Sequence, residues 1–215
     1  MPKDGKETRK RLLDAACTLL AEDSLSALSI ERISEKAGVS RRTFFAHFAT
    51  KDQLLAEVVD HMRPSYLDRY RAWSETSGPC ATVEERLQNI FECITSTALD
   101  PKWKGSCFIR VSAELGNQSG HPVHAVVSAA NRDMEKWLDA ELLRGGYTES
   151  DSLARQLVVM INGLLMLQLV TRSTAYGKDI VTALMRLLGT STRVLPTRAA
   201  PQPERARPIP VHRLS

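Results

Sequence analysis

Two adjacent arginines stand inside a polar stretch whose chemistry suits contact with nucleic acid. Residues 29–51 read SIERISEKAGVSRRTFFAHFATK and contain Arg41 and Arg42. Three further polar residues follow the arginines: Thr43, His47 and Lys51. A guanidinium can bind guanine O6 and N7 in the DNA major groove, and cations are attracted to phosphates. Packing inside an ordinary helical hairpin would not account for this group of residues, so the stretch is a candidate DNA-binding element.

The residues around the arginines predict two short helices joined by a tight turn. Ser29 can cap the first helix with its hydroxyl, and Gly38 suits the left-handed conformation that ends it. Ser40 can cap a second helix that begins at Arg41. The inner faces of the pair are expected to be apolar, through Ile33, Ala37, Phe44 and Phe48. This is the helix-turn-helix pattern, whose second helix enters the major groove by its N-terminal end.

At these residues the sequence resembles the TetR family of bacterial transcriptional regulators. The resemblance covers about residues 8–60. It rests on Ser29, Ile33, Ala37, Gly38, Val39, Ser40, Thr43, His47, Phe48, Lys51, Leu54 and Leu55. The alternative is a helical hairpin within some other all-α protein, which the adjacent arginines argue against.

The resemblance implies a DNA-binding role for the outer residues of the stretch, with phosphate contacts from Thr43, His47 and Lys51. The predicted DNA-binding residues are Ser29, Ser40, Arg41, Arg42, Thr43, Phe45, His47 and Lys51. Phe45 departs from the family, which usually has Tyr there and so gains a phosphate hydrogen bond. Ser24 stands where the family usually has Gly, which predicts a costly backbone conformation or a rearranged turn.

Composition places the chain among soluble globular proteins. It has 215 residues, 43% of them hydrophobic and 25% charged. The net charge of +4 comes from the Arg-rich residues 193–215, and the rest of the chain is balanced. Residues 1–51 nevertheless hold ten Lys and Arg against seven Asp and Glu, a local excess that suits phosphates. The Pro- and Arg-rich tail, 193–215, is predicted to be disordered. Its role stays open between nonspecific DNA affinity and none.

Four scattered cysteines form no C-x-x-C pair, which predicts no metal site and no disulfide. They fit a reducing cytoplasm, and no export signal is visible. The longest uncharged run, residues 156–171, is 16 residues long and would be short for a membrane span. We therefore expect a cytoplasmic protein with no membrane partner, no metal and no cofactor.

The remaining pattern predicts an all-α, TetR-like fold of about nine helices. A loose start, residues 1–6, precedes a helix over 7–22, and a helix over 51–73 is expected to kink or break at Pro64. Capping boxes at Thr82 and Thr148 open two later helices. The first of these covers residues 82–99, and further helices are predicted over residues 106–115, 122–144 and 177–188. The domains are then a DNA-binding head (1–50), a ligand-binding and dimerisation domain (51–192) and the tail.

The helix that follows Thr148 has no polar face, so it must be covered on all sides. The cover could come from a second copy of the chain, and the alternative is complete burial within one chain. TetR-like proteins dimerise through their last two long helices, so the resemblance implies a homodimer. The predicted contact residues are Leu157, Ile161, Leu164, Leu165, Gln168, Ile180, Leu184 and Leu188.

The helices of the second domain carry aromatic and sulfur side chains with a few polar groups among them. Such a mixture is typical of a small-molecule site, although a filled core is the alternative. The predicted ligand-binding residues are Phe91, Trp103, Cys107, Phe108, Arg110, Asn131, Met134 and Trp137. The expected effector is a mainly apolar compound of unknown identity.

No catalytic motif is present in the sequence. His121 and His124 lie three positions apart without an H-E-x-x-H, and there is no G-x-S-x-G, P-loop or G-x-G-x-x-G. We therefore predict no catalytic residue and no enzyme. The favoured function is a repressor that binds a palindromic DNA operator as a homodimer and is released by a ligand. The alternative is a DNA-binding module without a small ligand, either nucleoid-organising or protein-sensing.

Overall fold

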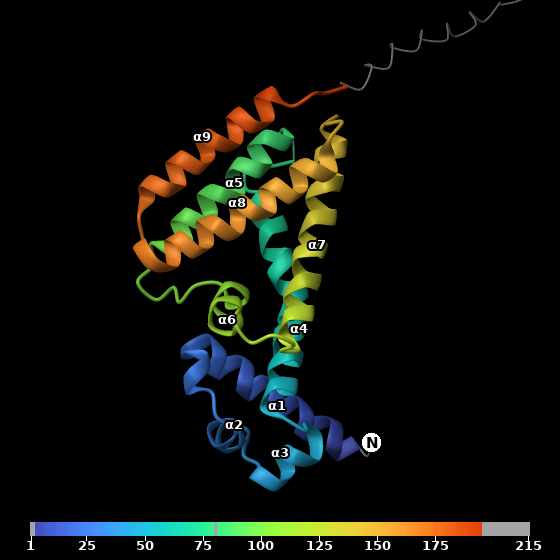
Figure 1. Ribbon diagram of the computed structural model, residues 1–215, viewed down its shortest axis with the longest axis vertical. Coiled ribbons are helices and arrows are strands. Elements are labelled where there is room, and N and C mark those ends of the chain that lie inside the picture. Colours follow the sequence, from blue (N-terminus) through green and yellow to red (C-terminus); the bar gives the residue numbers. More distant parts are fainter. Residues whose placement is uncertain (1–2, 80, 195–215) are drawn as a thin grey trace, which may run out of the picture.

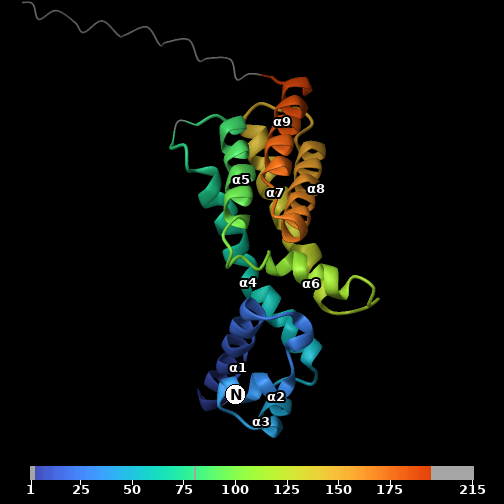
Figure 2. The same ribbon diagram turned by 90° about the vertical axis from the view of Figure 1, so that its left-hand side faces the viewer.

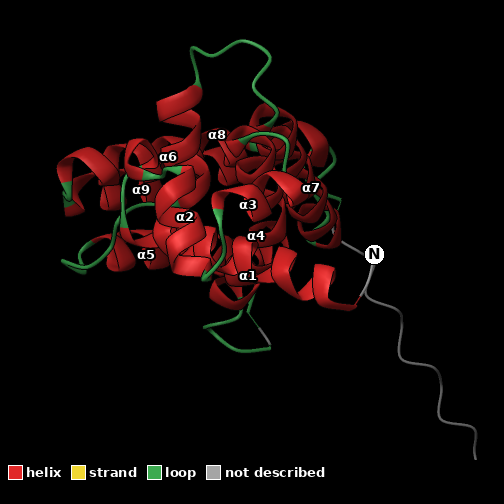
Figure 3. Ribbon diagram, turned by 90° about the horizontal axis from the view of Figure 1, so that it is seen from below, coloured by secondary structure: helices red, strands yellow, loops and turns green. Residues whose placement is uncertain are grey.

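The structure is a computed structural model that describes residues 3–79 and 81–194. Its elements follow one another as α1 (Lys3–Glu22), η1 (Leu25–Ala27), α2 (Ile30–Ala37), α3 (Arg41–His47), α4 (Lys51–Ser74), α5 (Val83–Ala98), α6 (Cys107–Leu115), α7 (Val123–Arg144), α8 (Ser150–Thr171) and α9 (Thr174–Thr190). Figures 1 and 3 show helices and loops throughout this part of the chain, in agreement with the predicted all-α fold. Within it the sole β-type pairing is one bridge between Tyr147 and Arg193.

The N-terminal head has a core built by four helices. Phe44 and Phe48 close α3 against α1, and both are at most 1% exposed. The first turns of α4 complete the same core, because Leu54 and Val58 are fully buried in it. The boundary proposed at residue 50 therefore divides the chain before α4, while the packing of the head continues through the start of that helix.

The body is formed by the second half of α4 with α5, α7, α8 and α9. Figure 2 shows these long helices standing above the head, with α4 running from one part into the other. The centre of the body is apolar and closed, with Ile90, Leu138, Leu157 and Leu184 all fully buried. Helix α8 packs against α7 and α5, and α9 packs against α5.

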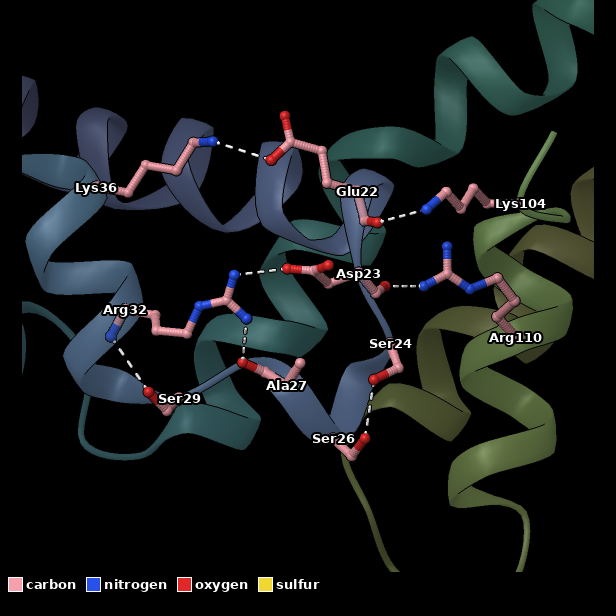
Figure 4. A network of polar contacts seen from close by, with 10 residues as sticks. All are labelled: Glu22, Asp23, Ser24, Ser26, Ala27, Ser29, Arg32, Lys36, Lys104 and Arg110. Atoms are coloured by element: carbon pink, nitrogen blue, oxygen red, sulfur yellow. Dashed lines mark hydrogen bonds and ion pairs between the residues drawn. The ribbon is translucent and has the colours of Figure 1, made fainter. Parts of the chain in front are cut away.

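Helix α6 lies between the two parts and joins them. Its apolar residues Phe108, Val111 and Leu115 are buried with the core of the head, although they follow it by some fifty residues in the sequence. Lys104, in the loop before α6, and Arg110, within α6, add polar contacts to the last residue of α1 and the residue after it (Figure 4). The joint between head and body therefore depends on α6 as well as on α4.

Three local expectations need correction, at the start of α1, at Pro64 and at Ser24. Helix α1 begins at Lys3, so residues 3–6 are helical and not loose. Of the kink or break expected at Pro64, the break does not occur: α4 continues through this exposed proline, whose ring can be accommodated on the solvent side. Of the two outcomes expected at Ser24, the costly conformation does not occur, since its φ of −70° and ψ of 157° are ordinary extended values.

The predicted capping box at Thr148 is also wrong. Helix α8 starts at Ser150, and the residue before it, Glu149, makes no side-chain cap. The hydroxyl of Thr148 donates instead to the carbonyl of Thr192 at 3.3 Å. Val194 N–H donates to the carbonyl of Gly146 at 2.8 Å, so the chain just after α9 packs on the turn before α8. Arg193 and Val194, the first two residues of the tail that was predicted to be disordered, are thus paired with the body, and residues 195–215 lie outside the described part of the chain.

Helix α8 is 22 residues long and, among the described residues, is the one helix long and apolar enough to cross a membrane. The helix is longer than the 16-residue uncharged run, because it begins at Ser150 and includes Arg155. Of its most apolar window, 44% is buried inside the protein. Core packing in the body therefore accounts for the apolar residues on one side of α8.

Candidate nucleic-acid interface

Local hydrogen bonds fix the turn between α2 and α3. Ser29 Oγ accepts from the backbone N–H of Arg32 at 3.2 Å, and Ser40 Oγ accepts from Thr43 N–H at 3.0 Å. Gly38 ends α2 with φ 65° and ψ 39°, a left-handed conformation that glycine adopts at little cost. The three predicted capping roles are confirmed, and they set the angle at which α3 leaves the head.

The two faces of α3 differ sharply. Phe44 and Phe48 point inward with ring centroids 5.9 Å apart, and the guanidinium of Arg9 lies 4.2 Å from the centroid of Phe48. On the outer face Phe45 is 46% exposed, beside exposed Ala46. Because the inner phenylalanines cannot turn outward without opening the core, the outer face of α3 is held in one orientation.

Arg41 and Arg42 both reach solvent at the N-terminal end of α3, but their surroundings differ. Arg41 Nη1 lies 2.6 Å from Glu31 Oε1, and its guanidinium carbon is 5.7 Å from the ring centroid of Phe45. Both partners of the ion pair are more than 60% exposed, so the pair contributes little and an external anion could replace Glu31. Arg42 forms no ion pair with any residue of 3–79 or 81–194.

The residues that the family resemblance implies as phosphate contacts are more buried, or more engaged in internal hydrogen bonds, than the two arginines. Thr43 Oγ1 shares a 2.8 Å hydrogen bond with Ser40 Oγ. His47 is half-buried, and its Nδ1 has no partner within the described residues. Lys51 Nζ donates to the carbonyl of Leu28 at 3.1 Å, which ties the first turn of α4 to the loop before α2. In this arrangement Lys51 supports the head from inside.

The comparisons with known proteins bear on this part of the chain. Residues 12–58 match the sequence model of the bacterial regulatory proteins, tetR family. The chain is 40% identical over 62 residues to the HTH-type transcriptional repressor Rv3405c of Mycobacterium tuberculosis, an alignment covering 29% of this chain and 33% of that protein. The chain belongs to the TetR family. The chain covers only a third of the length of this curated relative.

Solved TetR structures extend the similarity to the body. The crystal structure of sav143 from Streptomyces avermitilis, described as a candidate TetR regulator, is 27% identical with a TM-score of 0.70, over 84% of this chain and 97% of that one. A TetR regulator from Chloroflexus aurantiacus is 18% identical with a TM-score of 0.69, over 90% of this chain and all of that one. The second likeness shows the fold alone. Membership in a family of regulatory proteins agrees with the lack of catalytic motifs.

The predicted ligand site of this TetR protein divides into two groups. Four of its residues, Trp103, Cys107, Phe108 and Arg110, line an open cavity of about 650 Å³ between α1, α4 and the segment 102–110. The cavity lies at the joint of head and body, and we call it the joint cavity. Sequence analysis did not identify its other walls, because they come from α1 and α4, which lie far from residues 102–110 in the sequence.

The other four predicted ligand residues do not line this cavity. Phe91 and Met134 are at most 2% exposed and fill the core of the body. Asn131 accepts from Asn162 at 3.4 Å, and Trp137 Nε1 donates to Glu141 at 3.1 Å. The prediction of one pocket made by all eight residues is wrong, since these side chains pack between α5, α7 and α8.

The predicted dimer contacts also need correction. Seven of the eight residues are buried within the single chain, at most 4% exposed: Leu157, Ile161, Leu164, Leu165, Gln168, Leu184 and Leu188. Ile180 is half-buried. They form the side of α8 and α9 that packs on α5 and α7, so they are not an available surface. The uncovered side of α8 instead carries Val159, Met166, Leu167 and Val170, each 37% to 75% exposed.

His121 and His124 serve the helix start and are not arranged as a catalytic pair. Val123 N–H donates to His121 Nδ1 at 3.2 Å, at the beginning of α7. His121 is buried, and its Nε2 lies 3.5 Å from Asp52 Oδ1 on α4. His121 therefore links the start of α7 in the body to α4 in the head.

Proposed function

We propose that this TetR-family protein is a transcriptional regulator that binds a DNA operator through α3. The observation that carries the proposal is the exposed arginine pair at the start of α3, above an inner face locked by Phe44 and Phe48. A helix presented by its N-terminal end suits the major groove, where an arginine can read guanine. Such a protein would act in the bacterial cytoplasm, where the DNA lies.

The active form in this proposal is a homodimer that uses the uncovered side of α8. Val159, Gly163, Met166 and Val170 recur at helical spacing and are all exposed. An exposed apolar stripe of this kind is typical of a protein contact, and a two-fold arrangement lets one surface pair with itself. Two heads related by a two-fold axis require an inverted-repeat operator. A dimer on such a site would obstruct polymerase and therefore repress.

Release by a small effector is the third part of the proposal. The joint cavity supports it, because a ligand there would touch both the head and the body. The filled core of the body favours, as the second candidate, a regulator that has no small ligand within the body. A ligand can only shift DNA binding by as much as its affinities for the bound and released forms differ.

Selection of fragments from a random duplex pool by the purified protein, followed by sequencing, tests the DNA-binding function. The expected product is an inverted repeat with guanine at equivalent positions in both half-sites, protected on one face of the duplex. Enrichment of a single unrepeated site would contradict the dimeric arrangement. A pool that stays unenriched would contradict operator recognition itself.

A further inference from the structure

The joint cavity has the size and position of a ligand site that neither the head nor the body could form alone. Its walls come from α1, from the middle of α4 and from residues 102–110. Its volume of about 650 Å³ lies within the range of small-molecule sites. A molecule bound here would contact the head through α1 and the body through the segment before α6.

The charged groups around the cavity are mainly positive. Four cations line it, Arg69, Lys102, Lys104 and Arg110, against the single carboxylate of Asp14. Burial raises the pKa of the Cys107 thiol to about 11, so this wall residue is uncharged and does not offset the cations. A concave surface with an excess of one sign attracts the opposite charge. The cavity therefore suits an anion.

The apolar part of the wall is aromatic and well supported. The rings of Tyr66 and Phe108 lie with centroids 4.4 Å apart. The guanidinium carbon of Arg172 lies 5.1 Å from the centroid of Trp103, and its Nη2 donates to the carbonyl of that residue at 2.6 Å. Arg172 Nη1 also donates to the carbonyl of Asp100 at 3.1 Å. Arg172 thus holds the loop that carries Trp103, and the wall is prepared to stack against an apolar ligand body.

Two of the cations currently bind neutral acceptors of the head. Lys104 Nζ donates to the carbonyl of Glu22 at 3.0 Å, and Arg110 Nη2 donates to the carbonyl of Asp23 (Figure 4). A carboxylate or phosphate is a stronger acceptor for an ammonium or guanidinium than a peptide carbonyl. An anionic ligand in the cavity can therefore compete with the end of α1 for both donors.

From these observations we infer that the joint cavity binds a small organic anion with an aromatic body. Its anionic oxygens accept hydrogen bonds from Lys104 and Arg110, and its body lies against Trp103, Tyr66 and Phe108. Binding exchanges the contacts of these cations with Glu22 and Asp23 for contacts with the ligand. The end of α1 is thereby released from the body. The inference rests on the proposed function only for its consequence, which is a change in operator affinity.

Matched acids and alcohols test the site directly. Naphthoate and phenylbutyrate serve as carboxylate probes, naphthyl phosphate as a phosphate probe, and naphthalenemethanol and phenylbutanol as their neutral counterparts. Titration calorimetry on the full chain is expected to show at least about 10-fold tighter binding of each anion than of its alcohol. Inorganic phosphate alone should bind more weakly than naphthyl phosphate, because it lacks the body that stacks. A preference between carboxylate and phosphate identifies which headgroup the site takes.

Three variants connect the binding to named side chains. Lys104→Met and Arg110→Met are each expected to weaken naphthoate binding about 10-fold and to leave naphthalenemethanol binding unchanged. Arg110→Lys keeps the charge and should retain most of the acid affinity. Lys136→Met, an exposed lysine of α7 away from the cavity, is the matched control and should change neither. Thermal unfolding of every variant excludes a general loss of structure.

Equal affinity for acid and alcohol would overturn the inference. So would acid binding that both methionine variants retain, or failure of every anion to bind below about 1 mM. The operator assay separates this result from the proposed function. If the ligand-free protein binds its operator while no anion binds, anion binding in the joint cavity is refuted and the proposed regulatory function is supported. If an anion binds through Lys104 and Arg110 but no DNA sequence is selected, the anion site is supported and the proposed regulatory function is refuted.

Discussion

Helices α3 and α8 each present one free surface over one buried surface, yet the two free surfaces have opposite chemistry. The outer face of α3 exposes Arg41 and Arg42 over fully buried Phe44. The outer face of α8 exposes Val159 and Val170 over fully buried Leu157. A cationic surface suits a polyanion, and an apolar surface suits another apolar surface. The comparison implies that DNA binding and dimerisation can be altered separately, by changes on the outer faces alone.

The largest effect is expected from replacing a residue on the inner face of α3, and it is a loss of folding stability. Phe44→Ala removes a fully buried ring from the core of the head, and we expect a loss of about 3–5 kcal/mol in the free energy of unfolding. Phe45→Ala removes a neighbouring ring that is 46% exposed and should cost far less. Urea unfolding followed by circular dichroism measures both. Similar losses in the two variants would show that the faces of α3 are assigned incorrectly.

The next largest effect is expected from charged substitutions on the outer face of α8, which should weaken dimerisation and leave folding unchanged. Val159→Arg combined with Val170→Arg should weaken dimerisation by about 2–4 kcal/mol or more, because it places charge in an apolar contact. Analytical ultracentrifugation should then show monomers with an unchanged helical spectrum. Ala72→Arg, on the exposed side of α4, is the control and should remain dimeric. A double variant that stays dimeric would move the interface away from α8.

The contrast between α3 and α8 also shows what can be predicted from sequence. Helix α3 is amphipathic, so the spacing of Phe44 and Phe48 alone identifies its inner side. Helix α8 is apolar all round, and its covered side depends on α5, α7 and α9, which a local pattern does not describe. The predicted contacts at Leu157 and Leu164 lie on the covered side for this reason. The family resemblance implies contacts on the last two long helices but does not say which faces of them are free.

The joint cavity was only partly predictable for a related reason. The segment of Trp103, Phe108 and Arg110 was identified from its composition, but the cavity also needs walls from α1 and α4. Those walls come together only in the folded chain. Conversely, Phe91 and Met134 have the side chains of a pocket and lie in a filled core. Composition therefore does not distinguish an aromatic wall from aromatic packing.

The base-reading role of α3 is expected to appear as a moderate loss of operator affinity. Arg42→Ala, and separately Arg41→Ala, should each leave the fold intact, and the variant that removes a base contact should cost about 1–3 kcal/mol. Arg42 has no ion-pair partner within residues 3–79 and 81–194, so its replacement disturbs nothing inside the head. Fluorescence anisotropy with the selected operator measures the affinity. Full affinity and preference in the double variant would place the recognition surface elsewhere.

Replacement of Lys51 is expected to have the smallest effect, and it distinguishes two possible roles of this side chain. The family resemblance implies a phosphate contact, whereas the structure shows Nζ donating to the carbonyl of Leu28 at 3.1 Å. If the internal contact is its main role, Lys51→Met should lower the free energy of unfolding by about 1 kcal/mol and leave the salt dependence of DNA binding unchanged. If the ammonium turns to a phosphate, the slope of log affinity against log salt should fall by about one unit.

Because the Leu28 carbonyl is a neutral acceptor and DNA phosphate an anionic one, we expect this reduced salt slope for Lys51→Met in DNA binding. Without DNA, the same variant should still lose about 1 kcal/mol in the free energy of unfolding. Lys51 would then support the free head and contact phosphate in the complex. A variant with unchanged stability and unchanged salt slope would contradict both roles.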